Sequence, residues 1–318
     1  MARKKKEAAT QPAMQVESNH TIDDTGVLLV AIGSDFYGQL AFNMANSIKL
    51  SSPTTKIALV ADGVSLNKLL PYHKQRFDHI ISAKEGDCRE NHIVNPFKLK
   101  TYLYDYTPFE NTLYLDVDGL FLHPYKKFDD LIYSLKDIDF QMHEVRRWSY
   151  EEAPQSGMVW TKTGANKGQR LQELWGLYDI DKGNKYPEYN SSFIWFKKTD
   201  ANREYFANVK KCYMDRRFTG PQLLGKSYPD EMAWNITGAQ MGYYGKVEGY
   251  RPIYFNWQGD IRGPEELSKD YWFIGMAAGF QPSKLLAMYN NIAKRNSNAI
   301  GDRFFFKFDQ QRKIFFRK

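Results

Sequence analysis

An apolar run that carries two carboxylates, residues 111–122, limits what this chain can fold into. It reads Asn-Thr-Leu-Tyr-Leu-Asp-Val-Asp-Gly-Leu-Phe-Leu, so Asp116 and Asp118 lie among side chains that normally avoid water. On an extended strand, residues two apart face the same side. Two like charges buried side by side are costly unless a cation or strong hydrogen-bond donors balance them. A divalent metal would balance them and could also hold a diphosphate, so the run predicts a strand that ends at a metal and ligand site.

The residues before this run alternate between strand and helix patterns. Continuous apolar runs at 27–32 and 57–61 are typical of strands buried on both faces, and apolar residues recur at helical spacing between them. Asn95 and Pro96 begin a helix that leads into the acidic run. This alternation predicts an α/β fold with a mostly parallel, doubly wound sheet. Ligands of such sheets bind beyond the carboxyl ends of the strands, where residues 33–37 and the aspartate pair would both open.

Length, composition and cysteine usage set the broad class of the protein. A chain of 318 residues with 42% hydrophobic content can bury a sizeable core, as one large α/β domain or two small ones. No apolar stretch reaches the roughly 18 residues that a membrane span needs. Residues 1–24 are basic and then polar, without the apolar segment of a secretory signal, and predict a disordered tail. Cys88 and Cys212 form neither a disulfide framework nor a zinc spacing, which favours the cytosol. We expect one domain over residues 25–295, followed by a second tail over 296–318.

Aromatic and basic residues interleave in the second tail, and the net charge of +7 is concentrated at the two ends of the chain. On a helix, Phe304, Phe308 and Phe315 would share one face, as in an interfacial membrane helix. The same interleaving suits single-stranded nucleic acid, through stacking and phosphate contacts. A terminal element that packs on the domain with a charged outer face is the third interpretation.

Several motifs follow one another in a recognisable order. Asp35 and Tyr37 lie in the turn after the first strand, Lys98 lies at the start of a helix, and the aspartate pair follows. In this order the motifs resemble those of the GT-A fold glycosyltransferases of the glycogenin and lipooligosaccharide-galactosyltransferase group (family 8-like). The resemblance implies a GT-A fold, a mostly parallel mixed sheet flanked by helices. It also implies that Asp35 and Tyr37 bind uracil and ribose, that Lys98 reaches the donor phosphate or sugar, and that Asp116 and Asp118 hold a metal.

The resemblance covers roughly residues 27–290 and includes two later motifs. Asn190 and Ser192 stand where the group has a strand that lines the donor sugar. Asp230 and Glu231 stand where it has an acidic motif near the reacting sugar. The resemblance implies transfer with retention of the anomeric configuration. An inverting enzyme would instead need a carboxylate base on the acceptor side, and Glu231 could serve.

One motif of the group is incomplete in this chain. A His-x-x-Gly-x-x-Lys segment usually supplies a third metal ligand, but the corresponding residues 271–284 contain no histidine, and the last histidine of the chain is His143. A metal would then be held by Asp116, Asp118, the donor diphosphate and water, which suits Mg²⁺ as well as Mn²⁺. Activity with a weakened metal site, or without a metal, stays open.

Each of these side chains also has a purely structural interpretation. Lys98 could be a solvated helix lysine, and Tyr37 could only pack the turn. Asn190 and Ser192 could cap a strand, and the acidic pair at 230–231 could begin a helix, where the dipole favours negative charge.

These observations predict a hexosyltransferase that moves a sugar from a nucleotide-diphosphate sugar, UDP-linked, to a glycan or lipid-linked acceptor. We expect it in the cytoplasm, with a peripheral membrane or nucleic-acid contact through the C-terminal tail. Modification of a nucleic-acid base is a second hypothesis, because the basic termini would suit it. A non-catalytic nucleotide-sugar or glycan-binding protein on the same fold is a third. A nucleotidyltransferase would carry a Gly-rich loop with Lys or Arg after the first strand, and residues 33–37 do not.

Overall fold

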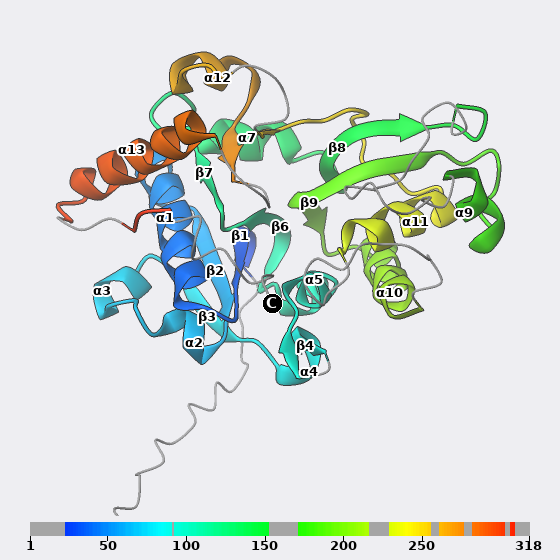
Figure 1. Ribbon diagram of the computed structural model, residues 1–318, viewed down its shortest axis with the longest axis horizontal. Helices are drawn as coiled ribbons and strands as arrows, with labels where there is room; N and C mark the ends of the chain where they lie inside the picture. The colour runs from blue at the N-terminus through cyan, green and yellow to red at the C-terminus, as the bar shows by residue number, and fades with distance from the viewer. Residues whose placement is uncertain are drawn as a thin grey trace, which may run out of the picture.

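The computed structural model has a six-stranded sheet at its centre, with helices on both faces (Figure 1). It describes residues 23–90, 92–152, 171–215, 229–255, 261–276, 282–302 and 306–308. The strands of the sheet are β1 (Asp23–Ala31), β2 (Lys56–Ala61), β3 (His79–Ser82), β6 (Phe109–Asp116), β8 (Phe140–Trp148) and β9 (Tyr186–Lys197). In the order β3-β2-β1-β6-β9-β8, the first four strands run parallel, and β9 is antiparallel to both of its neighbours. The predicted α/β fold with a mostly parallel mixed sheet is confirmed.

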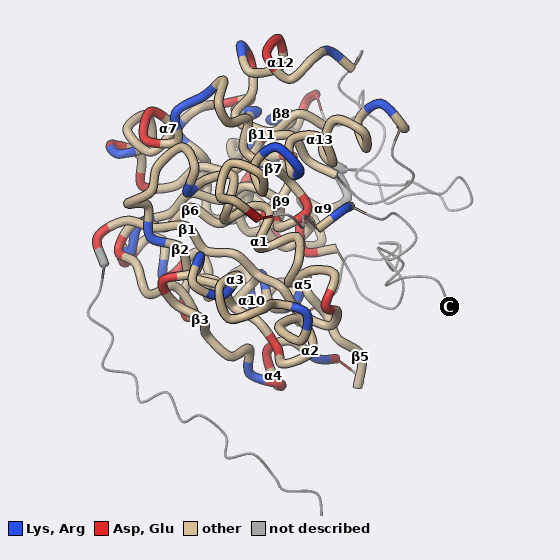
Figure 2. The backbone as a smooth tube through the Cα atoms, turned by 90° about the vertical axis from the view of Figure 1, so that its left-hand side faces the viewer, with Lys and Arg blue, Asp and Glu red and all other residues tan. Residues whose placement is uncertain are grey.

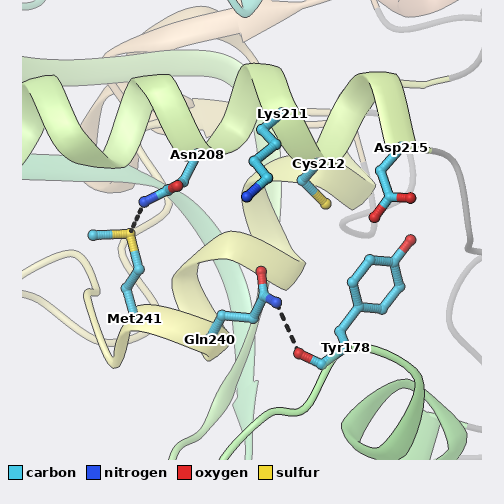
Figure 3. Close-up of a pocket in the computed structure, with 7 residues that line it drawn as sticks. All are labelled: Tyr178, Asn208, Lys211, Cys212, Asp215, Gln240 and Met241. Atoms are coloured by element: carbon cyan, nitrogen blue, oxygen red, sulfur yellow. Dashed lines mark hydrogen bonds between the residues drawn. The ribbon is translucent and has the colours of Figure 1, made fainter.

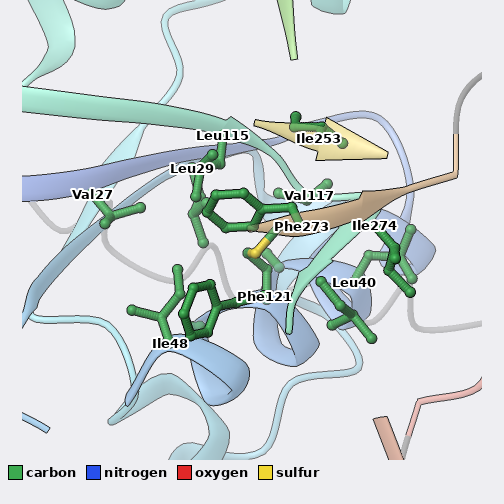
Figure 4. Packing of buried hydrophobic residues seen from close by; sticks show 14 of the residues in the cluster. Val27, Leu29, Leu40, Ile48, Leu115, Val117, Phe121, Ile253, Phe273 and Ile274 are labelled. Carbon is green, nitrogen blue, oxygen red and sulfur yellow. The ribbon is translucent and has the colours of Figure 1, made fainter. Parts of the chain in front are cut away.

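The first strand is apolar throughout because it faces a hydrophobic core on each side. Val27 and Leu29 point into a core shared with α1 (Asp35–Ser51) and α13 (Ser283–Ala299), as Figure 4 shows for the strand side of that core. Leu28 points into the second core, on the opposite face of the sheet. All three side chains are fully buried, as the continuous apolar run predicted.

The remaining elements connect and cover these strands. The other helices are α2 (Gly63–Leu66), α3 (Pro71–Lys74), α4 (Glu85–Cys88), α5 (Pro96–Lys100), α6 (Leu103–Tyr106), α7 (Phe128–Leu135), α9 (Leu171–Leu177), α10 (Asp200–Asp215), α11 (Glu231–Met241) and α12 (Pro264–Asp270). The other strands are β4 (Arg89–Glu90), β5 (Ile93–Val94), β7 (Gly119–Phe121), β10 (Ile253–Tyr254) and β11 (Phe273–Gly275). Of the helices within the described ranges, none combines the length and the apolar character needed to cross a membrane.

The acidic run does not form one continuous strand. β6 ends at Asp116, residues 117–118 form a turn, and β7 begins at Gly119 in a separate sheet of order β10-β11-β7. A Cβ atom at Gly119 would lie only 2.9 Å from the Ile274 carbonyl oxygen, so the chain passes close to β11 there. The prediction that both aspartates project from one strand is therefore wrong. Asp116 ends β6, and Asp118 lies in the turn that follows.

Part of the expected C-terminal tail packs on the domain. The Phe308 side chain is 1% exposed and lies against aromatic rings of α1 and α13. Asn290 holds the Phe308 backbone, accepting from its N–H at 2.7 Å and donating to its carbonyl oxygen at 3.5 Å. The expected domain boundary at residue 295 falls inside α13. Phe304 and Phe315, on which the membrane interpretation also depended, lie outside the described residues.

Charged residues of both signs are interspersed along the described part of the chain (Figure 2). The basic N-terminal segment, residues 1–22, is not among the described residues.

A glycine in α1 sets how closely this helix approaches α2. A Cβ atom at Gly38 would lie 1.8 Å from the Ser65 carbonyl oxygen, which can move only if the backbone of α2 moves. We expect Gly38→Ala to lower the free energy of unfolding by about 1–3 kcal/mol, because this overlap outweighs the better helix propensity of alanine. Gly176→Ala in α9, where nothing lies within 4 Å of the added Cβ, is the matched control and should be neutral or slightly stabilising. Urea unfolding measures both, and equal effects would contradict the close approach.

Candidate functional site

The turn after β1 is held at the carboxyl end of the sheet by a carboxylate from the neighbouring strand end. Gly33, with φ of 82°, donates its backbone N–H to Asp62 Oδ2 at 2.7 Å. The side chain of Ser34 then caps α1 by accepting a hydrogen bond from a backbone N–H of the first turn. The local sequence thus makes a tight turn followed by a helix start, which places Asp35 and Tyr37 at the beginning of α1.

Asp116 has both carboxylate oxygens occupied by hydrogen-bond donors. Its Oδ1 accepts from the Tyr114 hydroxyl at 2.5 Å and lies 2.8 Å from Lys100 Nζ. Its Oδ2 accepts from Lys100 Nζ at 3.0 Å and from the Ser192 hydroxyl at 2.8 Å. These donors come from β6, α5 and β9, so the three elements meet at the end of β6.

Lys100 is the buried cation of the site. The residue is 7% exposed, and its Nζ also donates to Ser191 Oγ at 3.1 Å. Burial alone would lower the pKa of Lys100, but the negative charges of Asp116, Asp230 and Glu231 outweigh it and raise the pKa above its ordinary value. The side chain is therefore a fixed positive charge that several carboxylates share.

Tyr37 and Asp118 face the same site. Burial, followed by the negative charges of Asp118 and Asp116, raises the pKa of Tyr37, and Lys100 offsets only part of this rise. The Tyr37 hydroxyl therefore keeps its proton and can donate a hydrogen bond. The backbone carbonyl of Asp118 accepts from Met276 N–H at 3.1 Å, which ties the turn to the segment after β11. The first turn and the aspartate pair thus meet at the carboxyl edge, as the sequence predicted.

A second acidic pair lies near Lys100 at the start of α11. Asp230 is fully buried, and its Oδ2 accepts from Trp234 Nε1 at 2.9 Å. Burial raises the pKa of Asp230, although Lys100 and the Trp234 indole act in the opposite direction. Glu231 is partly buried, and its Oε2 is a buried atom without a hydrogen-bond partner in the described part of the chain. Burial, and then the charge of Asp230, raises the pKa of Glu231 to about 8, so its carboxyl is mostly protonated at neutral pH.

The structure brings Lys100, rather than Lys98, to the aspartates. Lys98 Nζ donates instead to the backbone carbonyls of Gly86 at 2.5 Å and Arg89 at 3.1 Å. The helix predicted from Pro96 is also shorter than expected, because α5 ends at Lys100. Helical spacing could not have distinguished the two lysines, because α5 ends at Lys100 and Leu103 belongs to the next helix, α6.

The other predicted residues occupy more local positions. Asn190 Oδ1 accepts from the Ser192 backbone N–H at 3.1 Å, in keeping with its structural interpretation. Ser192, by contrast, reaches Asp116 and belongs to the cluster. Asp35 is the first residue of α1, and its Oδ1 lies 3.4 Å from the Ser34 hydroxyl. Tyr114 was missed by the motifs, although strand alternation places it on the same side as Asp116.

Asp116 does not fit as the metal ligand that the sequence predicted. A carboxylate offers about four lone-pair positions, and the donor contacts described above fill them. Of the predicted pair, Asp118 is then the one carboxylate left to bind a metal. Mg²⁺ and Mn²⁺ prefer several oxygen ligands, so one carboxylate is too few. Within the described ranges, no group of three or more His, Cys, Asp or Glu side chains is arranged to hold a metal. The structure instead balances the Asp116 carboxylate with the Lys100 ammonium and with two hydroxyl donors.

A separate cavity of about 260 Å³ lies between α10 and α11, away from these residues (Figure 3). Its lining consists of Tyr178, Asn208, Lys211, Cys212, Asp215, Gln240 and Met241. Two hydrogen bonds cross it, from Gln240 Nε2 to the Tyr178 carbonyl oxygen at 2.7 Å and from Asn208 Nδ2 to Met241 Sδ at 3.4 Å. None of the residues singled out from the sequence motifs lines this cavity.

No family model and no curated protein sequence matches the chain. Solved structures do match it. The galactosyltransferase LgtC, in complex with donor and acceptor sugar analogs, is 13% identical with a TM-score of 0.50, over 86% of this chain and 95% of that chain. The bifunctional glycosyltransferase WbbM in its apo form is 13% identical with a TM-score of 0.52, over 93% of this chain and 53% of that chain. The chain therefore has the GT-A fold of glycosyltransferases such as LgtC, the group that its sequence motifs resemble.

Proposed function

We propose that this chain is a glycosyltransferase that uses a nucleotide-diphosphate sugar, UDP-linked, as its donor. The GT-A fold supports this proposal, and one observation carries it: a buried ammonium lies among carboxylates at the carboxyl end of β6. In α/β sheets this edge is the usual place for a ligand. A fixed ammonium there suits a diphosphate, and the neighbouring hydroxyls and carboxyls suit a sugar.

The proposed reaction transfers a hexose to an acceptor hydroxyl. The bond between the sugar C1 and the diphosphate oxygen breaks, and its electron pair stays on that oxygen. The acceptor oxygen bonds to C1 and loses its proton, so the products are a glycoside, a nucleoside diphosphate and a proton. Lys100 stabilises the charge that develops on the departing diphosphate. Glu231 in its protonated form donates to a sugar hydroxyl and Asp230 orients the sugar, with retention of configuration as the proposed outcome.

The remaining predicted residues complete the donor site in this proposal. Tyr37 stacks on the uracil and Asp35 accepts from the base or ribose, because both lie at the start of α1 and Tyr37 faces the aspartates. Ser192, with Asn190 beside it, contacts the sugar hydroxyls. A glycan or lipid-linked acceptor in the cytoplasm is proposed, and the buried free thiol of Cys88 agrees with a reducing compartment.

Turnover of a panel of nucleotide sugars by the wild type and by Asp118→Ala tests this function. We expect one donor to be consumed and Asp118→Ala to lower its rate by about 100-fold or more, because the variant removes a charge that faces Tyr37 in the donor site. Asp105→Ala is the control: this carboxylate is 51% exposed and pairs with Lys210 at the surface, so the rate should not change.

Acceptors in the same assay are a lipid-linked glycan, a free glycan and DNA, so that base modification is tested alongside. If no nucleotide sugar is consumed and neither UDP nor GDP raises the melting temperature, the glycosyltransferase function is contradicted. The non-catalytic glycan-binding hypothesis would then stand in its place.

A further inference from the structure

Asp116 is already fully coordinated by groups of the protein itself. Two donors reach each of its oxygens, and one ammonium bridges both. A metal on Asp116 would have to displace at least one of these donors. Displacing Lys100 would leave a buried ammonium without its closest partner, which is strongly unfavourable.

The Lys100 side chain lies where a metal would otherwise be expected. Its Nζ is 2.8 Å and 3.0 Å from the two oxygens of Asp116, at the distances of charge-assisted hydrogen bonds. A dication on the same carboxylate would be a close neighbour of this ammonium and would be repelled by it. The chain also lacks the histidine that supplies the third ligand in the group it resembles. These observations concern different residues, and both point away from a metal.

Lys100 could exchange one of its three contacts for a phosphate oxygen. An ammonium has three N–H donors, and two of the contacts of Lys100 go to the same carboxylate. One of those two can pass to a phosphate oxygen while the other keeps the ion pair with Asp116. The contact to Ser191 Oγ, at 3.1 Å, can stay in place and hold the ammonium. Lysine is an established phosphate ligand as a compact point charge.

We infer that Lys100 takes the place of the divalent metal, so that this enzyme transfers its sugar without a metal ion; this rests on the glycosyltransferase function proposed above. The C1–oxygen bond breaks towards Lys100, the electron pair moves onto the diphosphate oxygen, and the ammonium stabilises the new charge without giving up its proton. Asp116 is then a positioning residue that holds the ammonium. Asp118 binds hydroxyls of the donor.

The first test compares turnover of the consumed nucleotide sugar in excess EDTA with turnover in Mn²⁺ or Mg²⁺. We expect the rates to agree within about twofold, because no step depends on a metal. A loss of about tenfold or more in EDTA that Mn²⁺ or Mg²⁺ restores would overturn the inference while leaving the glycosyltransferase function intact. Failure to consume any donor in any of these conditions would instead remove the function itself.

The second test separates the two lysines of α5. Lys100→Met is expected to lower kcat/KM for the donor by about 10²–10³-fold in EDTA, the usual effect of removing one donor to a developing negative charge. Lys98→Met is the matched comparison, because Lys98 contacts backbone carbonyls of α4 and β4, and it should stay within about twofold of the wild type. A larger loss of kcat/KM in Lys98→Met than in Lys100→Met would overturn the assignment of Lys100 as the phosphate ligand.

Binding provides a readout that does not depend on turnover. In EDTA, calorimetry should show that Lys100→Met weakens UDP binding at least about tenfold but leaves uridine binding unchanged, since only UDP carries the diphosphate. Equal losses for UDP and uridine would mean that the variant had damaged the whole pocket and that Lys100 has a structural role only. The double variant Lys100→Met with Asp116→Asn is the control for misfolding, because it does not leave the Asp116 charge unpaired. It should keep a cooperative unfolding transition and still bind uridine but not UDP.

Discussion

Lys100→Met is expected to lower the free energy of unfolding by about 3 kcal/mol, in addition to its effect on turnover. The reason is that the variant leaves the Asp116 carboxylate without its cation, in a place where the two side chains are only 9% and 23% exposed. Removing one partner of a buried ion pair costs more than the pair itself contributes, since the remaining charge stays desolvated. Urea unfolding of the purified variant measures the loss.

A surface pair provides the comparison for this prediction. Lys210 lies 2.6 Å from Asp105, but the two side chains are 27% and 51% exposed. Lys210→Met should therefore cost less than about 1 kcal/mol. Adding Asp116→Asn to Lys100→Met should recover most of the lost stability, because the orphaned charge is then gone. Similar losses for both lysine variants, or no recovery in the double variant, would show that Lys100 is not the buried counter-ion described here.

Glu231→Gln is expected to change how stability depends on pH. The pKa of Glu231 is about 8 in the folded protein, against 4.5 for an ordinary glutamate, because burial and the charge of Asp230 disfavour its ionised form. At a pH between these two pKa values, folding therefore takes up a proton. The contribution of Glu231 to stability is complete below about pH 4.5 and is lost as the pH rises towards 8, by up to roughly 1.4 kcal/mol per pH unit.

Glutamine resembles the protonated carboxyl and does not titrate, so the loss should be absent in the variant. We expect Glu231→Gln and the wild type to differ little at about pH 5, and the variant to melt at a clearly higher temperature at about pH 8.5. Taking the difference at each pH removes the contribution of groups that titrate in both proteins. Glu248→Gln, at a side chain that is 52% exposed, is the control and should change the melting temperature little. Parallel melting curves for Glu231→Gln and the wild type would contradict the buried, protonated state of Glu231.

The parts of the fold that followed from the sequence are those fixed by local pattern. The strands at 27–32 and 57–61 are continuous apolar runs because each is buried between two cores, and this pattern has few other causes. The proximity of Tyr37 to the aspartates also followed from the sequence, since the carboxyl ends of parallel strands share one edge of the sheet.

The errors arose where distant segments decide the local structure. Whether the acidic run continues as one strand depends on the pairing of β7 with β11, which lies about 150 residues further along the chain. The choice between Lys98 and Lys100 depends on where α5 ends, and on the arrival of Ser191 and Ser192 from β9. Nothing near residue 98 or 100 reports those contacts. The metal prediction stays a prediction, and two carboxylates in sequence did not reveal the lysine that pairs with Asp116.

The docking of Phe308 between α1 and α13 has a consequence for synthesis on the ribosome. Phe36 and Phe42 belong to the first helix, but the rings that cover them include Phe308 and Phe306. These residues are translated about 270 positions later, roughly 15–50 s after the helix leaves the ribosome at ordinary elongation rates. Throughout that interval an aromatic face of the nascent chain lacks its native cover. We therefore expect this protein to depend on chaperones while it is being made, and polypeptides released before residue 306 to aggregate.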